Sequence, residues 1–189
     1  MKHTLKLNWV PADARNPVFV QIDLKDVTFK ILDGSSPTPL ELTIKIGEGN
    51  LTYTESVERE YTPDRGLLDE VRDGDEQPLA VTFDFTWEFL RGGLGSGDPP
   101  TVEDALKNRG NAASWISSDS DTCRPFAVDI VVEYVPACGV GALADQETYT
   151  FPDFRFDTIE HDFRAGTVSV SGRCNVTEAT VLRAAQPSV

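Results

Sequence analysis

Residues 79–90 read LAVTFDFTWEFL, and this stretch decides the fold. Large apolar side chains occupy every odd position from Leu79 to Phe89, and polar side chains occupy most of the positions between them. Strict period-two alternation predicts a β-strand with one face in a core and one face in water. A helix would distribute the same apolar side chains around its whole circumference. The register is strongly specified, because a slip of one residue would expose every core side chain.

Similar extended patterns recur along the chain and predict a mainly β fold. Further strands are expected at residues 18–24, 27–31, 40–46, 51–55, 126–135, 147–156 and 167–175. The last two are expected to pair as an antiparallel hairpin. Pro152 cannot donate to a strand ladder, so an edge position or a bulge is expected there. About seven or eight strands with one helix predict a β-sandwich or barrel with a short flanking α-helix.

The helix is expected just after the glycine-rich connector that follows residue 90. Thr101 precedes an acidic residue, Asp104, by three positions, which is the spacing of a capping box. The spacing predicts a helix from Val102 to Arg109 that ends at Gly110.

The length of 189 residues fits a single domain, 1–189, with residues 1–17 as an N-terminal arm. Residues 57–78 (VEREYTPDRGLLDEVRDGDEQP) are highly charged and contain two prolines and two glycines. This composition predicts a long charged loop between two strands, with at most one helical turn at 67–71. A loop of this length is uncommon in a compact domain, and it is usually functional or disordered.

The balance of 31 acidic and 17 basic residues gives a formal net charge of −14. Such an acidic chain is not expected to bind nucleic acid by neutralising phosphates. The sequence shows neither an apolar run of the ~20 residues that a membrane span needs nor a signal-peptide pattern at its N-terminus. We therefore expect no membrane partner, and synthesis and retention in a cytosol. Three cysteines without a CxxC pair are expected to be reduced thiols.

Candidate chemical motifs are weak. Gly139–Ala144 matches GxGxxA, but an extended pattern follows it where a dinucleotide site requires a helix. The acidic cluster that begins at Asp69 fails the EF-hand spacing, and whether it binds a cation stays open. His3 and His161 are the only histidines, which excludes a multi-histidine metal site within one chain. The sequence therefore predicts no enzyme, no metal and no cofactor.

Several segments together resemble the tail tube (major tail) proteins of long-tailed bacteriophages. They are Ile46–Thr54 (IGEGNLTYT), Tyr61 with Asp64–Gly66, Arg72–Pro78 (RDGDEQP), Phe85–Glu88 (FTWE), Phe151–Phe154 (FPDF) and Gly172–Thr177 (GRCNVT). The resemblance extends from about Lys25 to Thr177 and rests on structural residues, without a catalytic motif.

The resemblance implies a β-sandwich subunit that forms homohexameric rings, which stack into a hollow tail tube. The tube would be a conduit for DNA ejection in the virion tail and would be assembled in the host cytoplasm. The implied partners are further copies of the chain, the tape measure protein, and tail terminator or distal tail proteins. DNA would pass without specific binding, because an acidic lumen repels it.

On this interpretation Asp84 and Glu88 are expected to line the lumen, together with Glu41 and Lys45 on a strand expected beside them. The long charged loop is expected to reach the next ring or subunit. Its candidate contact residues are Arg59, Glu60, Tyr61, Arg65, Asp69, Arg72, Asp73, Asp75 and Glu76.

The alternatives are a capsid decoration protein or a tail-neck protein, which are also β-rich and without catalytic motifs. A carbohydrate-binding β-sandwich would need an exposed aromatic platform. Most of the aromatic residues here instead occupy the alternate strand positions that are expected to face the core. A hydrolase would need a nucleophile and a base, for which the sequence offers no pattern.

Overall fold

The computed structural model describes residues 27–44, 50–65, 67–86, 99–134 and 146–183. The predicted arm at residues 1–17, the predicted strand at 18–24 and the GxGxxA motif at Gly139–Ala144 lie outside the described residues. No helix in the described ranges has the length and apolarity that a membrane span requires.

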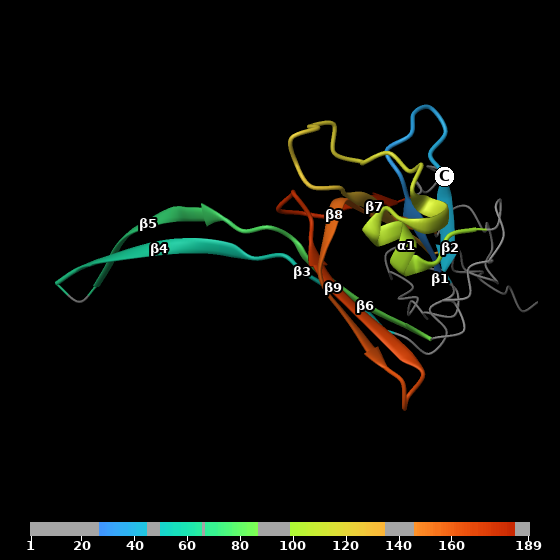
Figure 1. Ribbon diagram of the computed structural model, residues 1–189. Helices are drawn as coiled ribbons and strands as arrows, with labels where there is room; N and C mark the ends of the chain where they lie inside the picture. Colours follow the sequence, from blue (N-terminus) through green and yellow to red (C-terminus); the bar gives the residue numbers. More distant parts are fainter. Residues whose placement is uncertain (1–26, 45–49, 66, 87–98, 135–145, 184–189) are drawn as a thin grey trace, which may run out of the picture.

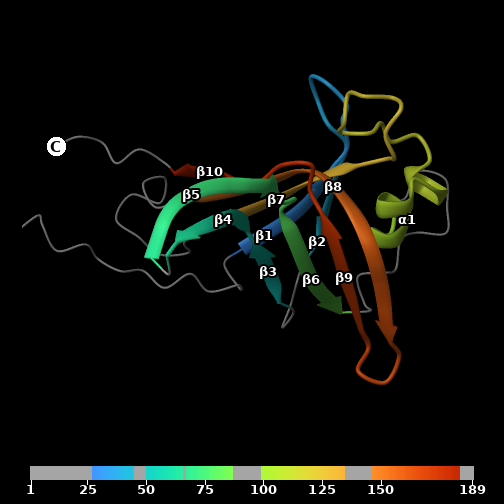
Figure 2. The same ribbon diagram turned by 90° about the vertical axis from the view of Figure 1, so that its left-hand side faces the viewer.

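The described chain is mainly β, as predicted, with ten strands and one short α-helix (Figures 1 and 2). The strands are β1 (Val27–Leu32), β2 (Glu41–Ile44), β3 (Leu51–Thr54), β4 (Val57–Asp64), β5 (Leu67–Glu76), β6 (Ala80–Thr86), β7 (Val128–Tyr134), β8 (Glu147–Asp162), β9 (Thr167–Arg173) and β10 (Thr180–Arg183).

Eight of these strands form one antiparallel sheet in the order β2-β1-β7-β8-β9-β6-β3, and β10 pairs with β8 outside this order. The 16-residue strand β8 belongs to two half-sheets. Its first part pairs with β7 and β10, and its second part pairs with β9. The register shifts near Asp153, which has a φ of 54°, so the bulge expected beside Pro152 is present. The predicted hairpin of the last two long strands is β8–β9.

The core lies between the two half-sheets. In β6 and the residue before it, Leu79, Val81, Phe83 and Phe85 are buried, whereas Asp84 is partly exposed. Phe83 contacts Phe29 of β1 with ring centroids 4.9 Å apart, and it also contacts Phe154 of β8 at 6.0 Å. The alternation predicted from the sequence is confirmed up to residue 86, and Trp87 and Phe89 lie outside the described residues.

The helix α1 (Val102–Lys107) begins at the predicted capping box. The Thr101 hydroxyl accepts a hydrogen bond from the Asp104 backbone N–H at 3.0 Å. The helix ends two residues earlier than predicted, because Asn108 adopts the left-handed conformation with φ 49° and ψ 52°. A 3₁₀ turn at Gly110–Ala112 follows. Val102, Ala105 and Leu106 are buried, so α1 covers a flank of the core.

The turn after β1 is fixed by a buried carboxylate, Asp33. It accepts hydrogen bonds from the Ser35 hydroxyl at 2.7 Å, the Leu40 N–H at 2.7 Å and the Ile116 N–H at 3.2 Å. Burial alone would raise the pKa of Asp33, but these hydrogen bonds outweigh it and lower the pKa below its usual value. The β1–β2 turn is thereby attached to the segment that follows α1.

The prediction of a long loop at residues 57–78 was wrong. β4 and β5 pair as an antiparallel hairpin that extends away from the sheet, and the predicted helical turn at 67–71 is part of β5 (Figures 1 and 2). A strand that is buried on one face has apolar residues at every second position. A ribbon that is exposed on both faces can form with paired backbone groups alone. Pro63 lies next to a register shift, where a residue without an N–H is tolerated.

Candidate assembly surfaces

The β4–β5 hairpin carries an apolar stripe on one face. Tyr61 lies directly opposite Val71, and Val57 alternates onto the same side of β4. The side chains of Tyr61, Val71 and Val57 are 56%, 53% and 72% exposed, respectively. Arg59 and Asp73 pair on this face between Val57 and Tyr61. The three residues Val57, Tyr61 and Val71 are called the apolar stripe.

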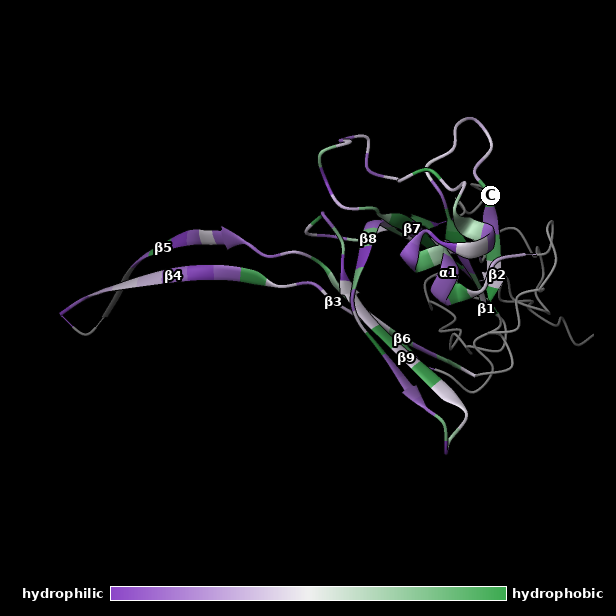
Figure 3. Cartoon of the chain, in the orientation of Figure 1, coloured by the Kyte–Doolittle hydropathy of each residue, from purple (hydrophilic) through white to green (hydrophobic). Residues whose placement is uncertain are grey.

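The opposite face of the hairpin is charged. Glu60 lies opposite Arg72, and Thr62 lies opposite Glu70. Arg72 Nη2 contacts Glu70 Oε2 at 3.0 Å within the same strand. Near the base, Gln77 donates a hydrogen bond to Glu58 at 3.0 Å. Figure 3 shows a mostly hydrophilic hairpin, whereas β6 and β9 in the body carry hydrophobic positions.

The remaining candidate contact residues of the predicted loop also belong to the hairpin. Arg65 is at the turn with a φ of 50°, Asp69 lies within β5, and Asp75 and Glu76 end that strand near the base. Eight acidic and three basic residues between positions 57 and 76 give the hairpin a net charge of −5. The hairpin is therefore an acidic arm that carries three exposed apolar side chains on one side, together with Arg59 and Asp73.

The base of the hairpin is attached to the body by backbone hydrogen bonds. The Leu79 N–H donates to Val176 O and the Cys174 N–H donates to Leu79 O, each at 2.8 Å. The Ala179 N–H donates to Glu55 Oε1 at 3.0 Å.

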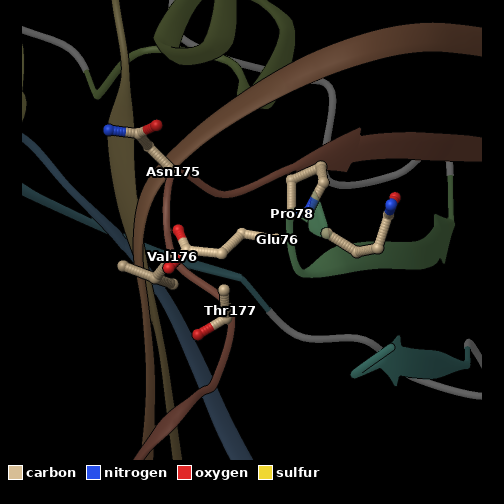
Figure 4. A pocket seen from close by; sticks show the side chains of 6 residues that line it. Glu76, Pro78, Asn175, Val176 and Thr177 are labelled. Carbon is tan, nitrogen blue, oxygen red and sulfur yellow. The ribbon is translucent and has the colours of Figure 1, made fainter. Parts of the chain in front are cut away.

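An open cleft of about 430 Å³ lies at this base (Figure 4). The residues that line it are Glu76, Gln77, Pro78, Asn175, Val176 and Thr177. These described lining residues include one carboxylate and no histidine, cysteine, lysine or arginine.

Asp84, the first predicted lumen residue, lies on the face of β6 that points away from the core. The register places Ser169 of β9 opposite Asp84, and Glu160 of β8 opposite Ser169. The neighbouring cross-strand pairs of β6, β9 and β8 also carry hydroxyl side chains. Among them, Thr158 and Ser171 share a hydrogen bond of 2.6 Å. This surface is called the hydroxyl-acid face; it comprises Thr82, Asp84, Thr86, Thr158, Glu160, Asp162, Thr167, Ser169 and Ser171.

Glu160 and Asp162 are members of this face that the sequence analysis did not select. The sequence signal for them was weak, because Ile159 is the one apolar residue of TIEHD at residues 158–162. Glu88, the second predicted lumen residue, lies outside the described residues.

The expectation that the strand of Glu41 lies beside the strand of Asp84 was wrong. Glu41 begins β2, and β6 has β3 and β9 as its hydrogen-bonded neighbours. Four strands separate β2 from β6 in the sheet order. Glu41 instead lies 3.8 Å from Lys30 Nζ, which also contacts Glu133 at 3.1 Å. Lys45 lies outside the described residues.

A second open cleft, of about 360 Å³, lies between α1, the segment before β7 and the bend of β8. Its lining residues are Leu106, Lys107, Pro125, Phe126, Arg155 and Phe156. Both charged residues in this lining are cations, although the protein as a whole is strongly acidic. This feature is called the cation-rimmed cleft.

The carboxylates around the cation-rimmed cleft are shared between cations. Glu103 contacts Lys107 at 2.6 Å and Arg109 at 2.7 Å. Arg109, which also contacts Asp104, is 53% exposed, whereas Glu103 is 24% exposed. The hydrogen bond from Lys107 outweighs burial and lowers the pKa of Glu103, so this carboxylate is charged at neutral pH.

The same arrangement recurs on the other side of the cleft. Asp119 contacts Arg155 at 2.6 Å and Arg124 at 3.3 Å, and Arg124 also contacts Asp121. Asp119 is 6% exposed, whereas Arg124 is 50% exposed. Hydrogen bonds from the Asp121 N–H and from Arg155 lower the pKa of Asp119. On both sides the cations are the more exposed partners of these ion pairs, and the four cations are matched by four carboxylates.

The interior of the bend in β8 holds further ionisable groups. Burial raises the pKa of Asp129, whose carboxylate accepts a hydrogen bond from the Asp153 N–H at 2.9 Å. Burial also raises the pKa of the Cys174 thiol to about 12, which keeps it protonated and unreactive at neutral pH. Cys123 and Cys174 are free thiols, as predicted, and Cys138 lies outside the described residues. No group of histidine, cysteine and acidic side chains within the described ranges could hold a metal ion.

No protein-family model matches this sequence, and no curated protein matches it either. Among solved structures, a chain of the anti-feeding prophage cap, a tube-terminating cap, is similar with a TM-score of 0.51 and 10% sequence identity. The match covers 92% of this chain and 99% of that chain. A chain from the six-fold symmetrised baseplate of the same prophage is similar with a TM-score of 0.45 and 12% identity, over 88% of this chain and 98% of that chain. At these identities the likeness is one of fold: almost the whole chain has the fold of a chain in a tube-terminating cap.

Proposed function

We propose that this chain is a structural subunit of a phage-tail-like particle, and that its copies assemble into stacked hexameric rings that form a hollow tube. The observation that carries the proposal is the exposed β4–β5 hairpin on a fold shared with a tube-terminating cap chain. An isolated two-stranded ribbon is marginal in water, so a ten-residue strand in such a ribbon needs a partner surface. Other copies of the chain provide that surface in a tube.

The edges of the sheet support the same role. β2 and β3 end the strand order, and both are short strands of four residues. Pairing between neighbouring copies would join such edges into a closed ring, which removes the exposed backbone groups of an open sheet. The proposed role is structural and requires no catalysis.

The hydroxyl-acid face is the proposed lumen wall. It carries Asp84, Glu160 and Asp162 among short hydroxyl side chains. Acidic groups repel a DNA backbone, so DNA would pass through without binding. The tape measure protein would occupy the same lumen, and terminator or distal tail proteins would contact the ends of the tube.

Electron microscopy of the purified protein over a concentration series tests this proposal. Hollow tubes or stacked rings are the expected result, and sedimentation velocity would show assembly that increases with concentration. A protein that is monomeric at every concentration would contradict the proposal.

A specific observation favours a second candidate function, a ring that terminates a tube. The solved structure with the higher of the two TM-scores is a tube-terminating cap. A terminator would form single rings that do not stack at any concentration, so the same micrographs distinguish the two functions.

The lumen assignment has its own test. Tubes of Asp84→Lys/Glu160→Lys are expected to retain DNA, whereas wild-type tubes release it. Glu41→Lys/Glu178→Lys is the matched control, because it gives the same change in charge at two exposed positions outside this face. If only the control tubes retain DNA, the hydroxyl-acid face is not the lumen wall.

A further inference from the structure

Two aspartates meet where β8 bends. Asp129 of β7 lies at the register shift between Val128 and Ile130, opposite the extra residue of β8. Its Oδ1 accepts a hydrogen bond from the Asp153 N–H at 2.9 Å, and Asp153 has a φ of 54°. The Asp129 carboxylate is therefore part of the bulge at which β8 passes from one half-sheet to the other.

A single hydroxyl lies between the two carboxylates. Ser118 Oγ donates a hydrogen bond to Asp153 Oδ1 at 2.9 Å, and it is also within hydrogen-bonding reach of the Asp129 carboxylate. A hydroxyl has one hydrogen, so it can donate to one carboxylate and must present a lone pair to the other. A proton on Asp129 removes this mismatch, because the protonated carboxyl donates to Ser118 Oγ while Ser118 donates to Asp153.

The other charged and titratable groups at the bend do not neutralise this pair. Arg155 directs its guanidinium to Asp119 Oδ2 at 2.6 Å, and its Nη1 contacts the Asp153 backbone carbonyl at 3.3 Å rather than the Asp153 carboxylate. Cys174 is buried and keeps its proton, because burial and the charges of Asp129 and Asp153 raise its pKa to about 12. Two like charges therefore lie together at the bend when both aspartates are ionised.

The position of the pair makes its charge relevant to the whole body. Hydrogen-bonded pairing passes between the half-sheets through β8, in the order β7-β8-β9. Ser118 is fixed at the same joint, because its N–H donates to Ala127 O at 3.0 Å. Repulsion between the two carboxylates acts against the bulge, and a proton held between them removes that repulsion.

We propose that Asp129 and Asp153 share one proton at the bend of β8, and that uptake of this proton stabilises the joint between the two half-sheets. The inference goes beyond the proposed function and does not depend on assembly. Burial raises the pKa of Asp129 above its usual value of 3.8, and the charge of Asp153 adds to this rise. The stabilisation is therefore fully present below pH 3.8 and is lost as the pH rises through the raised pKa.

The test compares Asp129→Asn with wild type by thermal unfolding at pH 7.5 and at pH 4. Asparagine keeps an oxygen that accepts from the Asp153 N–H, and its amide donates to Ser118 as a protonated carboxyl would. The substitution is expected to raise the midpoint of unfolding by about 2–4 °C at pH 7.5. The gain should shrink at pH 4, because wild-type Asp129 then takes up the proton itself. A lower midpoint than wild type at pH 7.5 would overturn the inference.

The control separates the pair from the overall charge, because neutralising any carboxylate relieves a chain of net charge −14. Glu160→Gln makes the same change in charge at an exposed position of β8. It is expected to leave the midpoint of unfolding within about 1 °C of wild type at both pH values. An equal gain in Glu160→Gln would assign the effect to net charge, and the inference would fail.

Hydrogen–deuterium exchange locates the effect and can be measured on the wild-type chain alone. After correction for the intrinsic pH dependence of exchange, the amides of residues 153–156 are expected to lose about threefold to tenfold in protection, relative to those of β6, between pH 4 and pH 7.5. In Asp129→Asn this loss should be absent. If the bend and β6 of wild type respond equally to pH, the inference is overturned, even where Asp129→Asn does not fold. Neither result bears on tube formation, so the proposed function is tested separately.

Discussion

The body of the molecule and its β4–β5 hairpin are both antiparallel β structure, but different interactions maintain them. In the body, β6 buries alternate side chains between two half-sheets. In the hairpin, all eight residues of β4 are exposed. The comparison shows that backbone pairing and the burial of side chains are separate contributions. A strand can form by pairing alone, but a strand that buries nothing adds little to the stability of its own chain.

The largest expected difference between the two regions is in the core. Phe83 is buried and contacts the rings of Phe29, Phe85 and Phe154. Phe83→Ala is expected to lower the free energy of unfolding by about 3–5 kcal/mol, because it removes buried area and leaves a cavity. Urea denaturation of the monomeric protein would measure this loss. A loss below about 1 kcal/mol would mean that the half-sheets do not share one core.

A smaller effect is expected where two strands of the body approach closely. A Cβ built on Gly172 would lie 2.2 Å from Arg155 O and 2.6 Å from Phe154 Cζ. The first contact is with backbone, which cannot move aside as a flexible side chain would. Gly172→Ala is therefore expected to destabilise the protein by about 1–3 kcal/mol. Gly166→Ala is the contrasting variant: its Cβ would meet nothing within 4 Å, so only the cost of its φ of +67° applies.

The sequence predicted the body well, because burial on one face leaves a period of two in the residue order. The strands β1, β6, β7 and β9 were all expected, and Thr101 with Asp104 located the start of α1. β10 was missed, because a four-residue strand with one partly buried side chain leaves no periodic pattern.

The hairpin was missed for the corresponding physical reason. Burial rather than pairing produces apolar alternation, and all of β4 and residues 70–73 of β5 are exposed. Of the prolines and glycines that indicated a loop, Pro63 lies at a register shift, and Gly74 lies where a Cβ would be 2.8 Å from Glu58 Cγ. Gly66 lies outside the described residues.

The candidate surfaces were only partly predictable. Asp84 was identified from its parity, but Glu160 and Asp162 join it through the pairing of three strands. The cation-rimmed cleft brings Lys107 beside Arg155, which is 48 positions away along the chain. Sequence spacing carries no signal for contacts of this kind, because they depend on the bend of β8.

A pH-dependent difference is expected in the body. Hydrogen bonds hold the pKa of Asp33 below its usual value of 3.8, so its ionised form stabilises the fold above that pH. This contribution is lost as the pH falls through the lowered pKa. Asp33→Asn is expected to cost about 1 kcal/mol at pH 7, and the cost should shrink as the pH falls below about 3.8. Denaturant unfolding of the wild type and of Asp33→Asn, at pH 7 and at pH 3, measures the cost at each pH. A constant cost at the two values would mean that the charge of Asp33 contributes nothing.

The smallest effect is expected in the hairpin, and it tests the comparison most directly. Tyr61→Thr/Val71→Thr removes two large side chains, as much apolar material as a severe core mutation. In the monomer these side chains are more than half exposed, so the free energy of unfolding is expected to change by less than about 0.5 kcal/mol. Urea denaturation at a concentration where wild type is monomeric measures this change. A loss comparable to that of Phe83→Ala would show that the stripe packs against its own chain, and the distinction between a self-sufficient body and an arm that depends on assembly would fail.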